Sequence, residues 1–155
     1  MLLGSKLLEA SVVEPGKLLE AAEILRSLID KIVLTPKPFS NYVQGMEIAA
    51  GARVLHVSGQ VGARVDGEIP ADPGEQHRLA WENALAILAG AGMSHSDIVD
   101  AHVYITSRDH VPLYRETRDR MLKRHKPAAT LLIVSGLADE RLVVEVDLVA
   151  AAPAT

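Results

Sequence analysis

The stretch 126–150, KPAATLLIVSGLADERLVVEVDLVA, decides the fold because it reads as two β-strands joined by a short turn, residues 129–134 and 142–149. Successive side chains of a strand point to opposite faces, so the second strand separates two sets of residues. One face carries only apolar side chains: Leu142, Val144, Val146 and Leu148. The other carries Val143, Glu145, Asp147 and Val149. The apolar face suits a covering of helices, and the mixed face is a candidate site, a candidate interface, or both.

The composition indicates a soluble cytoplasmic protein. The chain has 155 residues, 48% of them hydrophobic and 23% charged, which is typical of a globular domain with a proper core. The net charge of −4 and the lack of a Lys/Arg block argue against a nucleic-acid partner. Absence of cysteine excludes disulfides and thiolate chemistry. No apolar run reaches the roughly 18 residues of a membrane-spanning helix, so no membrane partner is expected.

Two segments are expected along the chain: an N-terminal extension, residues 1–32, and a main domain, residues 33–155. Apolar residues at helical spacing predict an amphipathic helix over about residues 17–31 of the extension. Two prolines, Pro36 and Pro38, then indicate an extended linker. The extra helix either caps the main domain or forms an interface.

The main domain is predicted to have the order β-β-α-β-α-β-β. Its elements are a hairpin of residues 42–49 and 53–60, a loop over 61–74, a helix over 74–89, a strand over 98–106, a helix over 110–123 with Asp109 as N-cap, and the two closing strands. Two helices can cover only one face of such a five- or six-stranded sheet. The mixed face is therefore expected to be buried against identical subunits.

The residues alone yield one candidate for chemistry, Glu145. No dinucleotide-binding, phosphate-binding or nucleophile motif is present, and the six histidines match no usual metal-ligand spacing, so neither cofactor nor metal is predicted. A carboxylate among valines on a central strand would be partly desolvated, which favours acid–base use. The alternative is that Glu145 and Asp147 pair with basic residues across a subunit interface.

Several short motifs, in order, resemble the RidA/YjgF family, also called the L-PSP family. They are Tyr42-Val43-Gln44, Val57-Ser58-Gly59-Gln60, Glu82-Asn83-Ala84, Ala91-Gly92-Met93-Ser94, Asp97-Ile98-Val99, Val103-Tyr104-Ile105-Thr106, Lys126-Pro127-Ala128 and Val144-Glu145-Val146-Asp147 followed by Leu148-Val149-Ala150. Each motif is weak, but their order and spacing over about residues 33–151 are specific.

The resemblance implies a chorismate-mutase-like α+β fold, a mixed sheet backed by two helices, in a homotrimer whose sheets face inward. It also implies ligand clefts between subunits and metal-independent hydrolysis of imines or enamines, such as 2-aminoacrylate, to 2-keto acids and ammonia. Glu145 would position the attacking water. Tyr42, with the backbone around Ser58, Gly59 and Leu131, would shape the cleft.

The chain departs from the family pattern at the carboxylate-binding arginine. That arginine should stand at position 129, where the chain has Ala129. An arginine binds a carboxylate through paired, charge-assisted hydrogen bonds that alanine lacks. A second departure is Arg115, where family members often have asparagine. Arg115 is a candidate to supply the missing charge; the alternative is a surface pair with Asp119.

Three functions follow from these observations. The first is a trimeric protein that binds a small anionic molecule in an intersubunit cleft and deaminates imines or enamines with altered substrate preference. The second is a non-catalytic small-molecule-binding or stabilising protein on the same fold. The third is RNA cleavage, which the acidic charge and the scarcity of stacking aromatic residues argue against.

Overall fold

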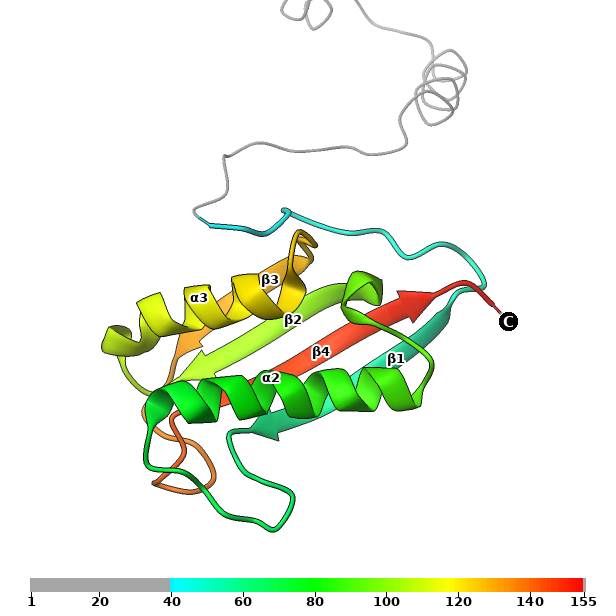
Figure 1. The fold of residues 1–155 in the computed structure, drawn as a ribbon. Coiled ribbons are helices and arrows are strands. Elements are labelled where there is room, and N and C mark those ends of the chain that lie inside the picture. Colours follow the sequence, from blue (N-terminus) through cyan, green and yellow to red (C-terminus); the bar gives the residue numbers. More distant parts are fainter. Residues whose placement is uncertain (1–39, 155) are drawn as a thin grey trace, which may run out of the picture. The chain divides into compact units, whose positions relative to one another are not determined.

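The computed structural model describes residues 40–154, which fold into one sheet with two helices against one of its faces (Figure 1). The elements in chain order are β1 (Arg53–Val61), α2 (Pro73–Gly90), the 3₁₀ turn η1 (His95–Asp97), β2 (Ile98–Ile105), the 3₁₀ turn η2 (Arg108–His110), α3 (Val111–Leu122), β3 (Ala128–Ile133) and β4 (Val144–Ala152). The strand order is β1-β4-β2-β3. β4 is antiparallel to both neighbours, whereas β2 and β3 are parallel.

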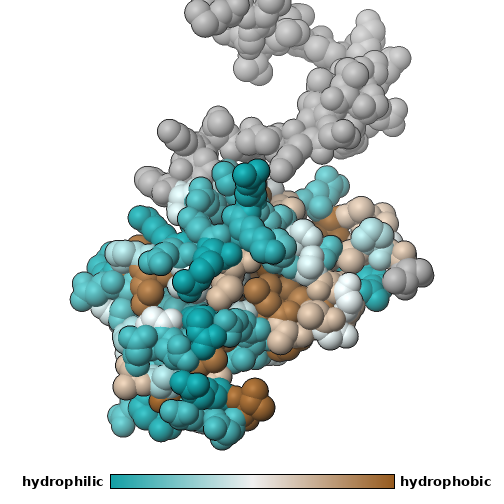
Figure 2. Space-filling view, in the orientation of Figure 1, coloured by the Kyte–Doolittle hydropathy of each residue, from teal (hydrophilic) through white to brown (hydrophobic). Residues whose placement is uncertain are grey.

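The core lies between the sheet and the helices, as the alternation in β4 predicts. Val144, Val146 and Leu148 are at most 1% exposed, and they meet Trp81 and Leu88 of α2. Hydrophilic side chains predominate on the outer surface of the helices (Figure 2). The predicted fold class, a mixed sheet backed by two helices, is confirmed. Within residues 40–154, no helix combines the length and apolar character needed to cross a membrane.

Two of the predicted strand pairings are wrong. Residues 42–49 form no strand, and the first pairing in the described chain is a single bridge between Val43 and Ala128. Met46 and Ile48 are each 38% exposed, so this segment buries too little apolar surface to offset the entropy of an ordered strand. The sheet consequently has four strands in the described chain, fewer than the five or six predicted.

The two closing strands do not form a hairpin either, because β2 lies between them. β3 follows α3, and a helical crossover from β2 returns the chain parallel to that strand. The connection from β3 then crosses β2 to bring β4 into the centre of the sheet. The buried face of β4 is nevertheless the predicted one, since Val144, Val146 and Leu148 are buried.

The start of α3 also differs from the prediction. Asp109 is not the N-cap: its backbone N–H donates to the Ser107 hydroxyl at 3.1 Å in the preceding turn, and α3 begins at Val111 without a side-chain cap. Helix α2, in contrast, is capped by Asp72, which accepts the N–H of Glu75 at 2.7 Å.

Candidate functional site

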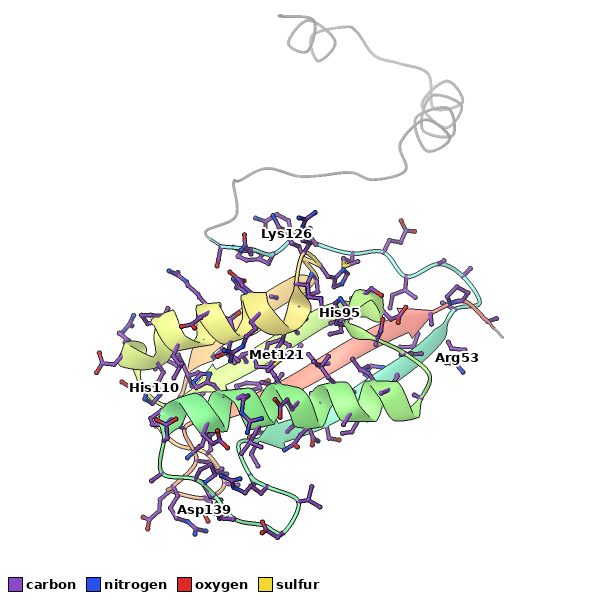
Figure 3. All side chains as sticks on the ribbon, viewed as in Figure 1. Arg53, His95, His110, Met121, Lys126 and Asp139 are labelled. Carbon is purple, nitrogen blue, oxygen red and sulfur yellow. The ribbon has the colours of Figure 1, made fainter. Side chains whose placement is uncertain are left out.

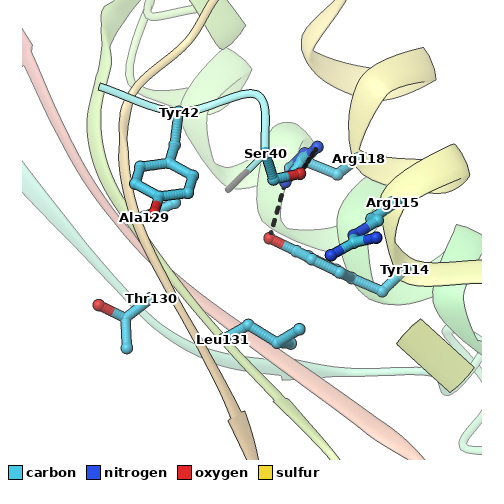
Figure 4. A pocket seen from close by; sticks show the side chains of 8 residues that line it. All are labelled: Ser40, Tyr42, Tyr114, Arg115, Arg118, Ala129, Thr130 and Leu131. Atoms are coloured by element: carbon cyan, nitrogen blue, oxygen red, sulfur yellow. Dashed lines mark hydrogen bonds between the residues drawn. The ribbon is translucent and has the colours of Figure 1, made fainter. Parts of the chain in front are cut away.

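A pocket of about 330 Å³ lies between α3 and the free edge of β3 (Figure 4). Three segments supply its walls: the chain before β1, helix α3 and strand β3. The lining residues are Ser40, Tyr42, Tyr114, Arg115, Arg118, Ala129, Thr130 and Leu131. This volume is at the lower end of the range for small-molecule sites, and it suits a metabolite of a few carbon atoms.

The pocket contains two arginines with different surroundings. Arg118 is 2% exposed, and its guanidinium donates to Asp119, to the Tyr114 hydroxyl at 3.2 Å and to the Ser40 hydroxyl at 3.1 Å. Arg115, one helical turn earlier, is exposed and forms no ion pair with any residue from 40 to 154. The surface pair of Arg115 with Asp119 is therefore wrong, because Asp119 binds Arg118 instead. Arg115 is the arginine with donors to offer a ligand.

The wall of the pocket opposite α3 carries no charged side chain among the lining residues. Ala129 and Leu131 pair with Ala101 and Val103 of β2, which are buried beneath the helices, so their side chains face the helix layer. Ala129 adds no polar group to the pocket. Tyr42 lies beside Ala129 in Figure 4, and the two tyrosines and Leu131 give the pocket an apolar body.

A second group of polar residues lies on the open face of the sheet, which neither helix covers (Figure 1). Glu145 of β4 is opposite Tyr104 of β2, and Asp147 is opposite His102. His102 Nδ1 and Asp147 Oδ1 are 2.8 Å apart, and His102 Nε2 lies 3.4 Å from Asp100. The hydrogen bond with Asp147, followed by the charges of Asp147 and Asp100, raises the pKa of His102 above its usual range despite partial burial.

The alternative expected from the sequence was that Glu145 and Asp147 pair with basic residues across a subunit interface. Asp147 has its partner within the chain, on the adjacent strand. A hydrogen bond from the Tyr104 hydroxyl to Asp147 raises the pKa of that phenol, with partial burial and the charges of Asp147 and Glu145 adding to the effect. Asp147 thus joins Tyr104 and His102 into one polar row.

Glu145 lies directly against Gly59 on the same open face. β1 contains an irregularity between Val57 and Gln60, which places Ser58 and Gly59 at a bulge next to β4. A Cβ atom at Gly59 would overlap the Glu145 carboxylate, so only glycine permits this approach. The glycine of the Ser58-Gly59 motif therefore makes room for the carboxylate.

The structure separates the predicted site residues into two groups. Tyr42, Arg115, Ala129 and Leu131 meet in the pocket, whereas Ser58, Gly59 and Glu145 lie on the open face of the sheet. The two groups occupy opposite faces, and β2 separates β4 from β3. The described chain therefore holds two separate groups of candidate site residues.

Sequence reasoning missed Ser40, Tyr114, Arg118 and Thr130 in the pocket and His102 on the open face. One signal was available for Arg118: it follows Tyr114 by four residues, so the two share a helix face. The same helical spacing would have predicted that Arg118 lies on the inner side. No comparable signal identifies Ser40, because its contacts depend on the path of the chain before β1.

The geometry defines an α+β domain with one helix-covered face, one open face and a small cationic pocket at the sheet edge. Comparison with known proteins is consistent with this description. The family model described as Endoribonuclease L-PSP matches residues 33–152. The Escherichia coli K12 protein named putative reactive intermediate deaminase TdcF is 34% identical over 92 residues, which cover 59% of this chain and 69% of that protein.

Solved structures agree with the sequence comparisons. The crystal structure of E. coli TdcF with bound serine superposes with a TM-score of 0.61 at 31% identity, covering 79% of this chain and 99% of that chain. The Rid-family protein YyfB from Yersinia pestis, of unknown function, shares the fold with a TM-score of 0.69 at 22% identity, covering 78% and 98%. The chain therefore belongs to the Endoribonuclease L-PSP family, which is the RidA/YjgF family.

Proposed function

We propose that the chain binds a small carboxylate-bearing metabolite and hydrolyses reactive imines or enamines to carbonyl compounds and ammonia. The observation that carries the proposal is the exposed Arg115 guanidinium in the pocket beside Ala129. Arg115 supplies a cation where β3 has none, so it is the group that holds the carboxylate of the ligand. The serine bound in the related TdcF structure supports a ligand that is small and bears a carboxylate.

The complete site forms between subunits of a homotrimer. One chain offers Arg115 and Tyr42 at its β3 edge, and a neighbouring chain offers Glu145 beside Gly59 on its open face. The separation of these groups within one chain supports this arrangement, because a single subunit leaves the cation and the carboxylate on opposite faces of the sheet. The open face also exposes Val54 (45%) and Leu132 (47%), apolar surface that association would bury.

The chemistry needs one carboxylate and one water molecule. Glu145 accepts a proton from water as the water oxygen attacks the imine carbon, and it passes that proton to the imine nitrogen, which restores the carboxylate. The resulting carbinolamine then forms its C=O bond and expels ammonia, so that an imine and water become a carbonyl compound and ammonia. An enamine such as 2-aminoacrylate enters the same sequence after tautomerising to the imine. Neither step requires a metal or a cofactor.

The test measures ammonia release from 2-aminoacrylate and from imines with larger side chains, together with the affinity for pyruvate. We expect Arg115→Ala to weaken pyruvate binding about ten- to a hundredfold, the effect of losing a charge-assisted hydrogen bond. Arg120→Ala, which alters an exposed arginine of the same helix, is the matched control and should leave affinity unchanged. Equal affinities for the wild type and Arg115→Ala would refute the role of Arg115.

Catalysis is tested separately at Glu145. Glu145→Gln should abolish ammonia release while pyruvate still binds, and Glu140→Gln, at an exposed loop position, should remain active. If the wild type and Ala129→Arg both bind pyruvate and neither releases ammonia, the chain is a non-catalytic binding protein on the same fold. Sedimentation analysis that gives a monomer at assay concentration would refute the intersubunit site.

A further inference from the structure

The segment that carries Tyr42 into the pocket is anchored at both ends. On one side, Ser40 accepts a hydrogen bond from Arg118, and the Asn41 side-chain amide donates to Asp119 Oδ2 at 2.9 Å. On the other side, the Val43 N–H donates to the Pro127 carbonyl at 3.1 Å, just before β3 begins. Residues 40–43 therefore span the pocket from α3 to β3, with Tyr42 between the two attachments.

The α3 anchor depends on one buried guanidinium. Arg118 Nε and Nη2 both donate to Asp119 Oδ1, at 2.9 and 2.7 Å, while Nη1 donates to the Tyr114 hydroxyl. The guanidinium carbon also lies 5.1 Å from the centre of the Tyr114 ring, within cation–π range. Four of its five N–H donors are directed to protein groups, which makes Arg118 less suited than Arg115 to bind a ligand carboxylate.

Asp119 connects the buried and exposed halves of this arrangement. Its Oδ1 accepts from Arg118 and its Oδ2 accepts from Asn41, so the orientation that Arg118 imposes on the carboxylate sets the position of Asn41. Figure 4 shows Ser40 and the Tyr114 hydroxyl bonded to the same guanidinium. A planar fork with several fixed donors can hold these groups at once, which a lysine ammonium cannot do in the same geometry.

We propose that Arg118 is a positioning residue for the ligand pocket: through Ser40, Asp119 and Asn41 it holds the segment that places Tyr42 over the pocket. This proposal rests on the proposed function in one respect, which is that the pocket is the site where the ligand binds. Arg118 thus completes the pocket wall, and Arg115 contacts the ligand. Two arginines one helical turn apart have separate tasks.

The first experiment needs no ligand. Hydrogen–deuterium exchange of the full chain should show residues 41–44 exchanging about tenfold faster in Arg118→Met than in the wild type, as expected when a charge-assisted hydrogen bond is lost. Peptides from α2 should be unchanged. Arg120→Met, the same substitution at an exposed position of α3, is the matched control. Unchanged exchange of residues 41–44 in Arg118→Met would overturn the proposal.

The second experiment separates positioning from general stability. Asn41→Ala removes only the exposed end of the arrangement, so its Tm should match the wild type while its affinity for pyruvate falls several-fold. Arg118→Lys should restore part of the affinity lost in Arg118→Met. A normal affinity in Asn41→Ala together with normal exchange of residues 41–44 would overturn the proposal. If wild-type protein binds no carboxylate, the proposed function fails, and the exchange experiment still decides the role of Arg118.

Discussion

His77 makes the domain sensitive to acid, and the size of the effect can be worked out from its surroundings. Its ring on α2 is fully buried, and neither ring nitrogen has a hydrogen-bond partner within the described residues. The His110 ring meets it edge-to-face, with centroids 5.9 Å apart, where the N-terminal end of α2 approaches the start of α3 (Figure 3). Burial, with a smaller contribution from His110, lowers the pKa of His77 to about 4.

The sign of the pH dependence follows from this lowered pKa. The unfolded chain binds a proton at His77 below its usual pKa of 6.5, whereas the folded chain binds one only near pH 4. Stability is therefore complete above about pH 6.5 and falls as the pH decreases toward 4. Linkage gives a loss of about 2 kcal/mol at pH 5 and about 3 kcal/mol at pH 4 from this residue alone.

The measurement is urea unfolding between pH 7.5 and 4.5 of the wild type, His77→Leu and a control. His77→Leu removes the buried imidazole, so its free energy of unfolding should vary less with pH, by about 2.5 kcal/mol over this range. His95→Gln, at a partly exposed ring in η1, should keep the wild-type pH dependence. His102 contributes with the opposite sign, because its pKa is raised, and it is present in all three proteins. Identical pH profiles for the wild type and His77→Leu would refute the reasoning.

Three further predictions test other parts of the fold. Gln76→Leu should destabilise the domain by about 2–4 kcal/mol in urea unfolding, because the buried Gln76 side chain bonds three backbone groups of two loops. Gly59→Ala should displace the Glu145 carboxylate and abolish ammonia release, with a circular dichroism spectrum that stays that of the wild type. Asp147→Asn should lower the pKa of His102, which an NMR titration of the ring measures. The stability that charged His102 contributes below pH 6.5 should decrease in the same variant.

The sequence predicted the parts of the fold that depend on local periodicity. The alternation in β4 identified its buried face, and the apolar stripe of Trp81 and Leu88 identified the inner side of α2. Strand order depends instead on which segments meet in space. The short connection between β3 and β4 favoured a hairpin of these two strands. The helical crossover through α3 instead makes β3 parallel to β2.

The sequence suggested individual candidate residues, but not where the fold would place them. The resemblance to the family suggested Tyr42, Gly59 and Glu145. Their distribution over two faces of the sheet depends on the register of β4 with β1 and β2. Arg118 was missed because a charged side chain on a helix is usually solvated, whereas this one is buried by the partners that satisfy it.

The proposed role of Arg115 places the cation on α3 and not on β3, and this would change how the site selects a ligand. A side chain at position 129 would start from the sheet and be held by its neighbours on β2, whereas Arg115 starts from the exposed side of a helix. In the proposed site, the long and exposed Arg115 side chain loses conformational entropy when it binds a carboxylate, and this loss would disfavour the smallest anions. Ala129 leaves space beside Tyr42 and Leu131 that an apolar substituent of the ligand can fill, and burial of that substituent offsets the entropy. We therefore propose that this pocket selects ligands that combine one anionic group with an apolar body, because α3 supplies the charge and β3 supplies the space.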